Sequence, residues 1–440
     1  MNARSEIPVW RRRQGRKGFC RNAFLWGFGN GLVSTSLVIY IIRSLNPPAG
    51  IGLAITWIIA APRLIGILRI LTPVLIDWVG SRRRVCLIGS ILSPLILLTL
   101  PLFLLLGFDW ARLHSGFTMV LIGVIWGLYH LIEYFSTVSL WSWMGDYVPD
   151  RIRVRFLARR ERSMIAGQFP GMLAAGLYTW ARLAFGVLPE DRWQIYLLPA
   201  FCGIFSLIAA AFPLWNIADV PWKRISGLKE RILDLIAPLR SKSFRALILF
   251  GAWIQIANGL TQGPQSVFQM NVLGITMLTA LALQSWTRIG QMLFAGSAGR
   301  LLARFDQKKI MGISLFLTAA GPLFYFIADR NSWYLVFASA TLWIAWIGIN
   351  IGMNNLILSL APEGDRSSWI AVYFITATLA FGISVLIGGW ILDHFGKEIL
   401  SVPRIGFSCD YCRFSFLYGS LLRFLGIFFL WRIAFNVNSK

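Results

Sequence analysis

Arg63, Glu133 and Arg288 stand out in this sequence because charged side chains are unusual so deep within apolar stretches. His130 precedes Glu133 by three residues, which places the two on one face of a helix. A carboxylate beside an imidazole can take up and release a proton, and a guanidinium can hold an anionic group through its fork of donors. These residues therefore predict a substrate or proton site, with a permanent buried ion pair that only fixes helix packing as the alternative.

The elements that must position these residues are membrane-spanning helices. Of the 440 residues 57% are hydrophobic and only 14% charged, whereas a soluble domain has about 25% charged residues. Runs of about 20 apolar residues, long enough to cross a bilayer, occur twelve times. These runs are 22–42, 50–76, 85–107, 117–140, 164–187, 194–215, 245–263, 274–299, 310–328, 333–358, 369–392 and 414–435.

The predicted fold is an all-α integral membrane protein with twelve transmembrane helices in two pseudo-symmetric six-helix halves. The halves are residues 1–215 and 243–440, and residues 216–242 form a cytoplasmic linker with a short amphipathic helix around 225–236. An internal repeat favours this division, because Asn30-Gly31-Leu32 in the first span recurs as Asn258-Gly259-Leu260 in the seventh.

The basic residues predict the orientation of these helices. Of the 42 lysines and arginines, 29 lie on the side of the N-terminus, seven on the other side, and six within the spans. Because cytoplasmic loops carry the excess of lysine and arginine, we expect a multi-pass protein of the cell membrane with both termini in the cytoplasm. The net charge of +23 is then a signal of orientation and of contact with anionic lipids, and nucleic-acid binding is not expected.

The depth of each charged residue follows from the helical rise. Arg63 and Glu133 lie about 20 Å from the loops that end their spans, and Arg288 lies at a similar depth in the second half. Each costs on the order of 3 kcal/mol at a helix centre, so we expect Arg63 and Glu133 to face one another or share a cavity. Three other intramembrane arginines are expected near span ends, where they reach the head groups: Arg182, Arg300 and Arg423.

The loops carry motifs at matching places in the two halves. After the second span the sequence has Asp77, Gly80, Arg82 and Arg83, and Pro73 precedes them. The corresponding loop after the eighth span has Gly299, Ala303, Arg304, Asp306 and Lys308. After the fourth span come Asp146, Pro149 and Arg153.

On these motifs the chain resembles the major facilitator superfamily over nearly its whole length. That family has a Gly-x-Leu-Ala-Asp-x-x-Gly-Arg-Lys signature between helices two and three. In this chain Pro73 occupies the position of the first glycine, and in the second copy of the motif, after the eighth span, Ala303 occupies the position of the aspartate. The resemblance implies alternating access, with the loop residues acting as a gate whose contacts form in one state only. Simple topology signalling is the alternative for the arginines.

The resemblance also implies that helices one, four, seven and ten surround a central path. Asparagines occur on the first, seventh and tenth predicted spans, at Asn30, Asn258, Asn350 and Asn354. Taken singly, each is more simply an interhelical hydrogen bond worth about 0.6 kcal/mol. Their clustering on these spans favours a polar cavity.

The predicted function is secondary active transport of a small solute across the lipid bilayer. The solute is anionic if an arginine holds it, and coupling to a proton is a hypothesis. Phosphate-loop, zinc-helix and serine-nucleophile motifs are absent, so no enzyme activity, cofactor or metal is expected. We expect a monomer. A transport-inactive sensor or scaffold and a lipid flippase are the alternatives, and Cys409 with Cys412 could form a disulfide, bind a metal or be there by chance.

Overall fold

The chain is almost entirely helical in the computed structural model, which describes residues 8–33, 45, 58, 60–188, 193–220, 228–275, 277–362, 366–395, 399–402 and 407–433. The first group of helices is α1 (Val9–Leu32), the 3-10 helix η1 (Gly66–Leu71), α4 (Thr72–Val79), α5 (Arg82–Leu113), α6 (Ser115–Tyr147), α7 (Asp150–Ala184), α8 (Gln194–Ala209) and α9 (Phe212–Trp215).

The second group follows the linker. It consists of α10 (Leu228–Arg240), α11 (Lys242–Val267), the π-helical turn η3 (Phe268–Val272), α12 (Met277–Arg304), α13 (Gln307–Ile327), α14 (Leu335–Leu342), the 3-10 turn η4 (Trp343–Ala345), α15 (Trp346–Leu360), α16 (Arg366–Phe395) and α17 (Tyr411–Trp431). An antiparallel hairpin, β1 (Ile399–Val402) and β2 (Phe407–Asp410), separates α16 from α17, with Ile399 paired to Asp410.

Local chemistry explains where several helices begin and end. The side chains of Ser81, Ser241 and Asp306 accept hydrogen bonds from backbone amides in the first turns of α5, α11 and α13. Gly80 ends α4 in the left-handed conformation, with φ of 73°, which glycine adopts without steric cost. The glycine of the first loop motif is thus the residue that lets the chain turn from α4 into α5.

Eight helices of the described residues are long and apolar enough to cross a membrane. They are α5, α6, α8 with α9, α11, α13, α14 with α15, α16 and α17. The predicted spans 22–42, 50–76, 164–187 and 274–299 match none of the eight, and much of 34–57 lies outside the described residues. A helical membrane protein is therefore confirmed, while the number of twelve stays a prediction.

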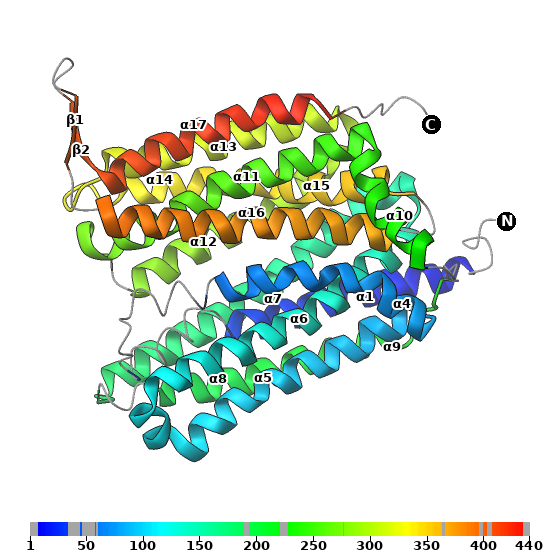
Figure 1. Cartoon of the computed structure of the whole chain (residues 1–440), viewed down its shortest axis with the longest axis horizontal. Helices are drawn as coiled ribbons and strands as arrows, with labels where there is room; N and C mark the ends of the chain where they lie inside the picture. The colour runs from blue at the N-terminus through cyan, green and yellow to red at the C-terminus, as the bar shows by residue number, and fades with distance from the viewer. Residues whose placement is uncertain are drawn as a thin grey trace.

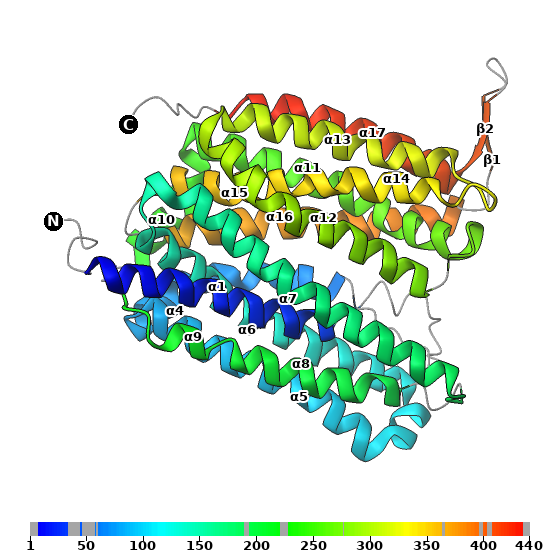
Figure 2. The same ribbon diagram turned by 180° about the vertical axis from the view of Figure 1, so that it is seen from behind.

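The helices form two groups, as Figures 1 and 2 show: those before residue 216 lie on one side and those after residue 227 on the other. Within the groups α1 packs on α7, α5 on α6, α11 on α16 and α13 on α17. The most extensive contacts between the groups are α7 with α12 and η1 with α16, and α7 with α15 and α4 and α6 with α16 add to them. Both termini lie at one end of the molecule, which we call the termini end, and the β hairpin lies at the opposite end (Figure 1).

The repeated Asn-Gly-Leu motif marks a packing contact that occurs in both groups. A Cβ atom at Gly31 would overlap backbone atoms of α7 at Gln168, and one at Gly259 would overlap Ser384 and the backbone of Phe381 in α16. Only glycine allows the backbones to approach so closely. The internal repeat read from the sequence therefore corresponds to equivalent helix pairs, α1 with α7 and α11 with α16.

The basic segment after the fourth predicted span, residues 151–162, is helical and forms the first turns of α7. Pro149 precedes the helix and Asp150 occupies its first turn, both favourable at a helix start, and the segment contains neither glycine nor proline. In the linker, the structure has the helix α10 close to the predicted amphipathic segment.

Candidate functional site

A cavity of about 700 Å³ lies between the two groups of helices. One wall comes from α1, α6 and α7, and the other from α11, η3, α12, α13, α14, η4 and α15. The lining residues that carry polar or aromatic groups are Asn30, Trp126, Tyr129, His130, Gln168, Gln262, Gln265, Ser266, Gln269, Gln284, Thr287, Arg288, Gln291, Tyr325, Ser339, Trp343, Trp346 and Asn350. The lining includes the last turns of α11 and of α13 and the first half of α12, and these ends of the helices lie away from the termini end (Figure 1).

The wall is rich in amide groups. Six glutamines and two asparagines line it, and among the described residues that line it none is acidic. Gln168 Nε2 donates to Asn30 Oδ1 at 3.3 Å, so two of the amides hold one another across α7 and α1. Such a wall offers both donors and acceptors to a polar solute.

Arg288 of α12 is the arginine on the cavity wall. Its Nη1 donates to Gln291 Oε1 at 3.0 Å, and Gln291 Nε2 donates to the carbonyl of Trp343 at 3.1 Å. The buried carboxylate of Glu161, on α7, interacts electrostatically with Arg288 from the other group of helices. Among the described residues no carboxylate lies within ion-pair distance of this guanidinium.

Glu133 does not line the cavity but contacts His130, which does. His130 Nδ1 is 3.0 Å from Glu133 Oε2, and Trp26 Nε1 donates to Glu133 Oε1 at 3.1 Å. The two side chains of the pair are 17% and 12% exposed, so neither is fully buried. The neighbouring rings of Trp126 and Tyr129 flank the imidazole, each with its centroid 4.7 Å away.

The expected contact between Arg63 and Glu133 is not formed, and Arg63 does not line the cavity in the part of the chain that the structure describes. Arg63 lies over the ring of Phe381 in α16, at 4.7 Å, while Glu133 is directed toward α1. Helical rise predicts how far along a helix a residue lies, but it does not determine the side of the helix on which the residue lies. A direct ion pair between Arg63 and Glu133 is thus absent from the described residues, and a shared site for them stays a prediction.

Arg69, to which the sequence gave no role, packs in the same region as Arg63. Its guanidinium lies 3.5 Å from the ring centroid of Tyr134, and its Nη1 donates to the carbonyl of Phe374 at 3.3 Å. Both arginines thus connect the η1 segment to α16 across the groups of helices.

Arg423 is a second correction, because it lies in the middle of α17 and is 2% exposed rather than near a span end. Its nitrogens donate to Asn258 Oδ1, Thr261 Oγ1 and the carbonyl of Gly419, each at 3.0 Å. Asn258 is therefore a partner of Arg423 and does not line the cavity, and Asn354 does not line it either, whereas Asn30 and Asn350 do.

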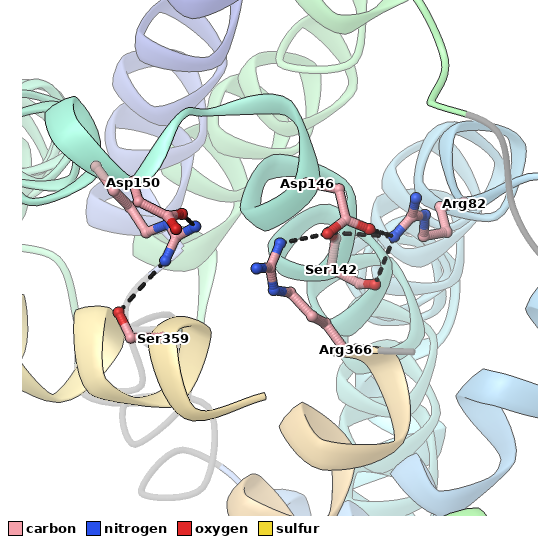
Figure 3. A network of polar contacts seen from close by, with 7 residues as sticks. Arg82, Ser142, Asp146, Asp150, Ser359 and Arg366 are labelled. Carbon is pink, nitrogen blue, oxygen red and sulfur yellow. Dashed lines mark hydrogen bonds and ion pairs between the residues drawn. The ribbon is translucent and has the colours of Figure 1, made fainter. Parts of the chain in front are cut away.

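The loop motifs build a buried ionic network at the termini end (Figure 3). Asp146, at the end of α6, accepts from Arg82 Nη1 at 2.5 Å and also pairs with Arg366 at the start of α16. Arg82 further donates to Ser142 Oγ at 3.2 Å. These charged side chains are at most 8% exposed, so the pair between Asp146 and Arg366 is a water-poor link between the groups of helices.

A second link in this region is made by Arg153 of α7. It pairs with Asp150 and donates to Ser359 Oγ of α15 at 3.3 Å, across the same boundary (Figure 3). Asp77 is buried in α4, and α4 packs against α5 and α16. Arg83 donates to the carbonyl of Trp215, which connects the motif to the end of α9.

The second copy of the loop motif is built differently. Gly299 packs against Ala158 of α7, Asp306 caps α13 by accepting from the amide of Lys308 at 2.9 Å, and Lys308 Nζ donates to the carbonyl of Ile433 at 2.8 Å. Arg304 is exposed, beside Phe305. Cys412 is a buried free thiol, and the side chain of Cys409 lies outside the described residues.

The sequence matches no protein-family model and no curated protein. Three solved structures of transporters are similar to the chain. The human organic anion transporter MFSD10 is 13% identical with a TM-score of 0.65, and the alignment covers 96% of this chain and 100% of that one. The fucose:proton symporter FucP of E. coli is 12% identical with a TM-score of 0.70, covering 96% and 98%.

The third is a bacterial homologue of the iron transporter ferroportin in an outward-facing state, 15% identical with a TM-score of 0.64, covering 95% of this chain and 98% of that one. At such identities the likeness establishes the fold. The resemblance that the loop motifs suggested is confirmed at that level.

Proposed function

We propose that this chain, which has the fold of the major facilitator superfamily, is a secondary active transporter of a small solute that works by alternating access. The observation that carries the proposal is the cavity of about 700 Å³ together with the ionic network at the termini end. Because Asp146 and Arg366 belong to different groups of helices, the termini end can open only when their contact breaks.

In this proposal the chain crosses the cell membrane twelve times, as two six-helix halves that comprise residues 1–215 and 243–440 and a linker of residues 216–242. The excess of basic residues on the side of the N-terminus supports cytoplasmic termini. The ionic network then lies at the cytoplasmic end, and the cavity lies toward the outside. In this proposal the present form is the outward-facing one, and the transporter works as a monomer.

Proton coupling is the finer part of the proposal, with Glu133 as the carboxylate that takes up the proton. The contact of 3.0 Å between His130 and Glu133 supports it, because His130 lines the cavity and can pass a proton to the carboxylate behind it. The other oxygen of Glu133 accepts a hydrogen bond from Trp26 of α1.

The test of alternating access measures the distance across the termini end. Spin labels at Arg151→Cys and Pro362→Cys, two exposed positions on opposite sides of the network, are introduced into a chain without its native cysteines. We expect a dominant short distance by double electron–electron resonance, and a larger population of a longer distance in Asp146→Asn, which removes the charge that holds Arg366. A single unchanged distance in both proteins would favour the alternative of a sensor or scaffold.

The test of proton coupling uses the same labels. Lowering the pH from about 8 to about 5.5 protonates a coupled carboxylate and imidazole, so the two populations should exchange in the wild type and stay fixed in Glu133→Gln. His394→Gln is the matched control, since His394 is an exposed histidine at the opposite end of α16 from Arg366. A pH response that survives Glu133→Gln would remove Glu133 from the coupling.

A further inference from the structure

The interior of the helical body contains more positive than negative charge. Five arginines and two glutamates lie among the helices between the ionic network and the opposite end: Arg63, Arg69, Arg160, Arg288, Arg423, Glu133 and Glu161. Arginine stays protonated in proteins, and within the described residues none of these five forms an ion pair with a carboxylate. The interior therefore favours an anion that enters it and disfavours a cation.

The arginine that meets the cavity is Arg288. One nitrogen of Arg288 donates to Gln291, which leaves its other donors available. Arg423 adds positive charge from behind Trp343, a lining residue, because the Arg423 guanidinium lies 5.6 Å from the centroid of the Trp343 ring. A carboxylate in the cavity would form charge-assisted hydrogen bonds with Arg288, which are about twice as strong as neutral ones. Because the described residues place one arginine on the cavity wall, we expect the ligand to carry one carboxylate.

The remainder of the wall is neutral and polar, with flat aromatic surfaces. Gln168, Gln262 and Asn350 offer amide donors and acceptors, and Trp126 and Trp346 offer ring faces. Such groups bind hydroxyl, amide or ring substituents and add no charge that would compete with a carboxylate. The volume of about 700 Å³ accommodates a solute of the size of a single sugar or aromatic ring with accompanying water.

We propose that the cavity binds a small organic monoanion whose carboxylate is held by Arg288. The proposal deepens the transport function and rests on it, because it names the class of solute for the same cavity. It also replaces Arg63, which lies over Phe381, as the arginine that holds the anion.

The experiment uses pairs of compounds that differ only in the charged group. Glucuronate is compared with glucose, and benzoate with benzamide, by thermal shift and by tryptophan fluorescence of the purified full-length chain in nanodiscs. We expect the carboxylate of at least one pair to bind tenfold or more tightly than its neutral partner, with the preference lost in Arg288→Gln. Arg300→Gln, an exposed arginine of the same helix, should keep it.

Each other result counts against the proposal. Equal or tighter binding of the neutral compounds would overturn it, and so would an anion preference that persists in Arg288→Gln. The proposal would also fail if neither carboxylate bound at a concentration of about 10 mM, which is tenfold above a millimolar dissociation constant. The spin-label distances keep this failure separate from that of transport. Two exchanging distances at the termini end without carboxylate binding would remove the anion and leave alternating access in place.

Discussion

Two of the places where the groups of helices meet each contain intramembrane arginine but differ in what surrounds it. Where η1 meets α16, Arg63 and Arg69 lie against Phe381, Tyr134 and a backbone carbonyl, and no part of the cavity reaches them. Where α7 meets α12, Arg288 lines the cavity beside amides. The difference teaches that an intramembrane arginine is a candidate for binding when its donors face an opening, whereas one covered by rings holds helices together.

The largest effect is expected at the contact of α7 with α12. A leucine at Gly299 would overlap Ala158, because even a Cβ there has no room. Overpacking of this kind typically costs about 1–3 kcal/mol, so Gly299→Leu should lower the midpoint of thermal unfolding clearly. Gly296→Leu is the matched control three residues away, where nothing lies within 4 Å of a Cβ. Equal melting of both variants would mean that α7 and α12 are not tightly packed.

The next effect concerns the contact of η1 with α16. Arg69→Met keeps the volume but removes the interaction with Tyr134 and the hydrogen bond to Phe374, which together are worth about 2 kcal/mol. We expect lower thermal stability with unchanged binding to the cavity. Arg288→Met should give the reverse, with nearly unchanged stability. If both variants lost binding and neither lost stability, the contrast between the two contacts would be wrong.

A smaller effect is expected at Gly80, which ends the short helix that packs against α16. Its φ of 73° is strained for any other residue, so Gly80→Ala should cost about 1 kcal/mol in thermal unfolding. Gly107→Ala is a suitable comparison, because an added Cβ there meets nothing and φ is negative. A loss that is no greater at Gly80 than at Gly107 would contradict the requirement for the left-handed turn.

The smallest effect tests the carboxylate that faces Arg288. Glu161→Gln removes a negative charge that acts on the same guanidinium from α7. A carboxylate probe such as benzoate should then bind about threefold more tightly, a gain of less than 1 kcal/mol. Fluorescence titration of both proteins measures it. Weaker binding in Glu161→Gln would indicate that Glu161 positions Arg288 rather than competing with the anion.

The sequence predicted the class of fold because apolar runs of membrane-spanning length are a strong signal. It also identified Asp146, Arg82 and Arg153, whose loops match a family pattern, and these residues do form buried links. Arg366, the partner of Asp146 from the other group of helices, was not among the predicted site residues. A loop pattern describes one segment, and it does not contain the residue that packs against it.

The cavity was predicted in part. Asn30, Asn350, His130 and Arg288 line it, but Glu161 was taken as part of a basic loop. Glu161 lies within a segment that contains six arginines and no glycine or proline. The lack of helix-breaking residues could have indicated that this segment is helical and continues into the body of the protein. Pairing across helices depends on helix rotation, which spacing along one chain does not determine.

The glycine contacts described for α1 with α7 and for α11 with α16 have a mechanical consequence. Backbones that touch at Gly31 and Gly259 cannot slide past one another without collision, so each helix pair behaves as a rigid unit. The pair of α1 and α7 presents the α7 surface that meets α12, and the pair of α11 and α16 presents the α16 surface that meets η1. We therefore expect any displacement to be a rotation of one pair relative to the other, without bending inside either pair.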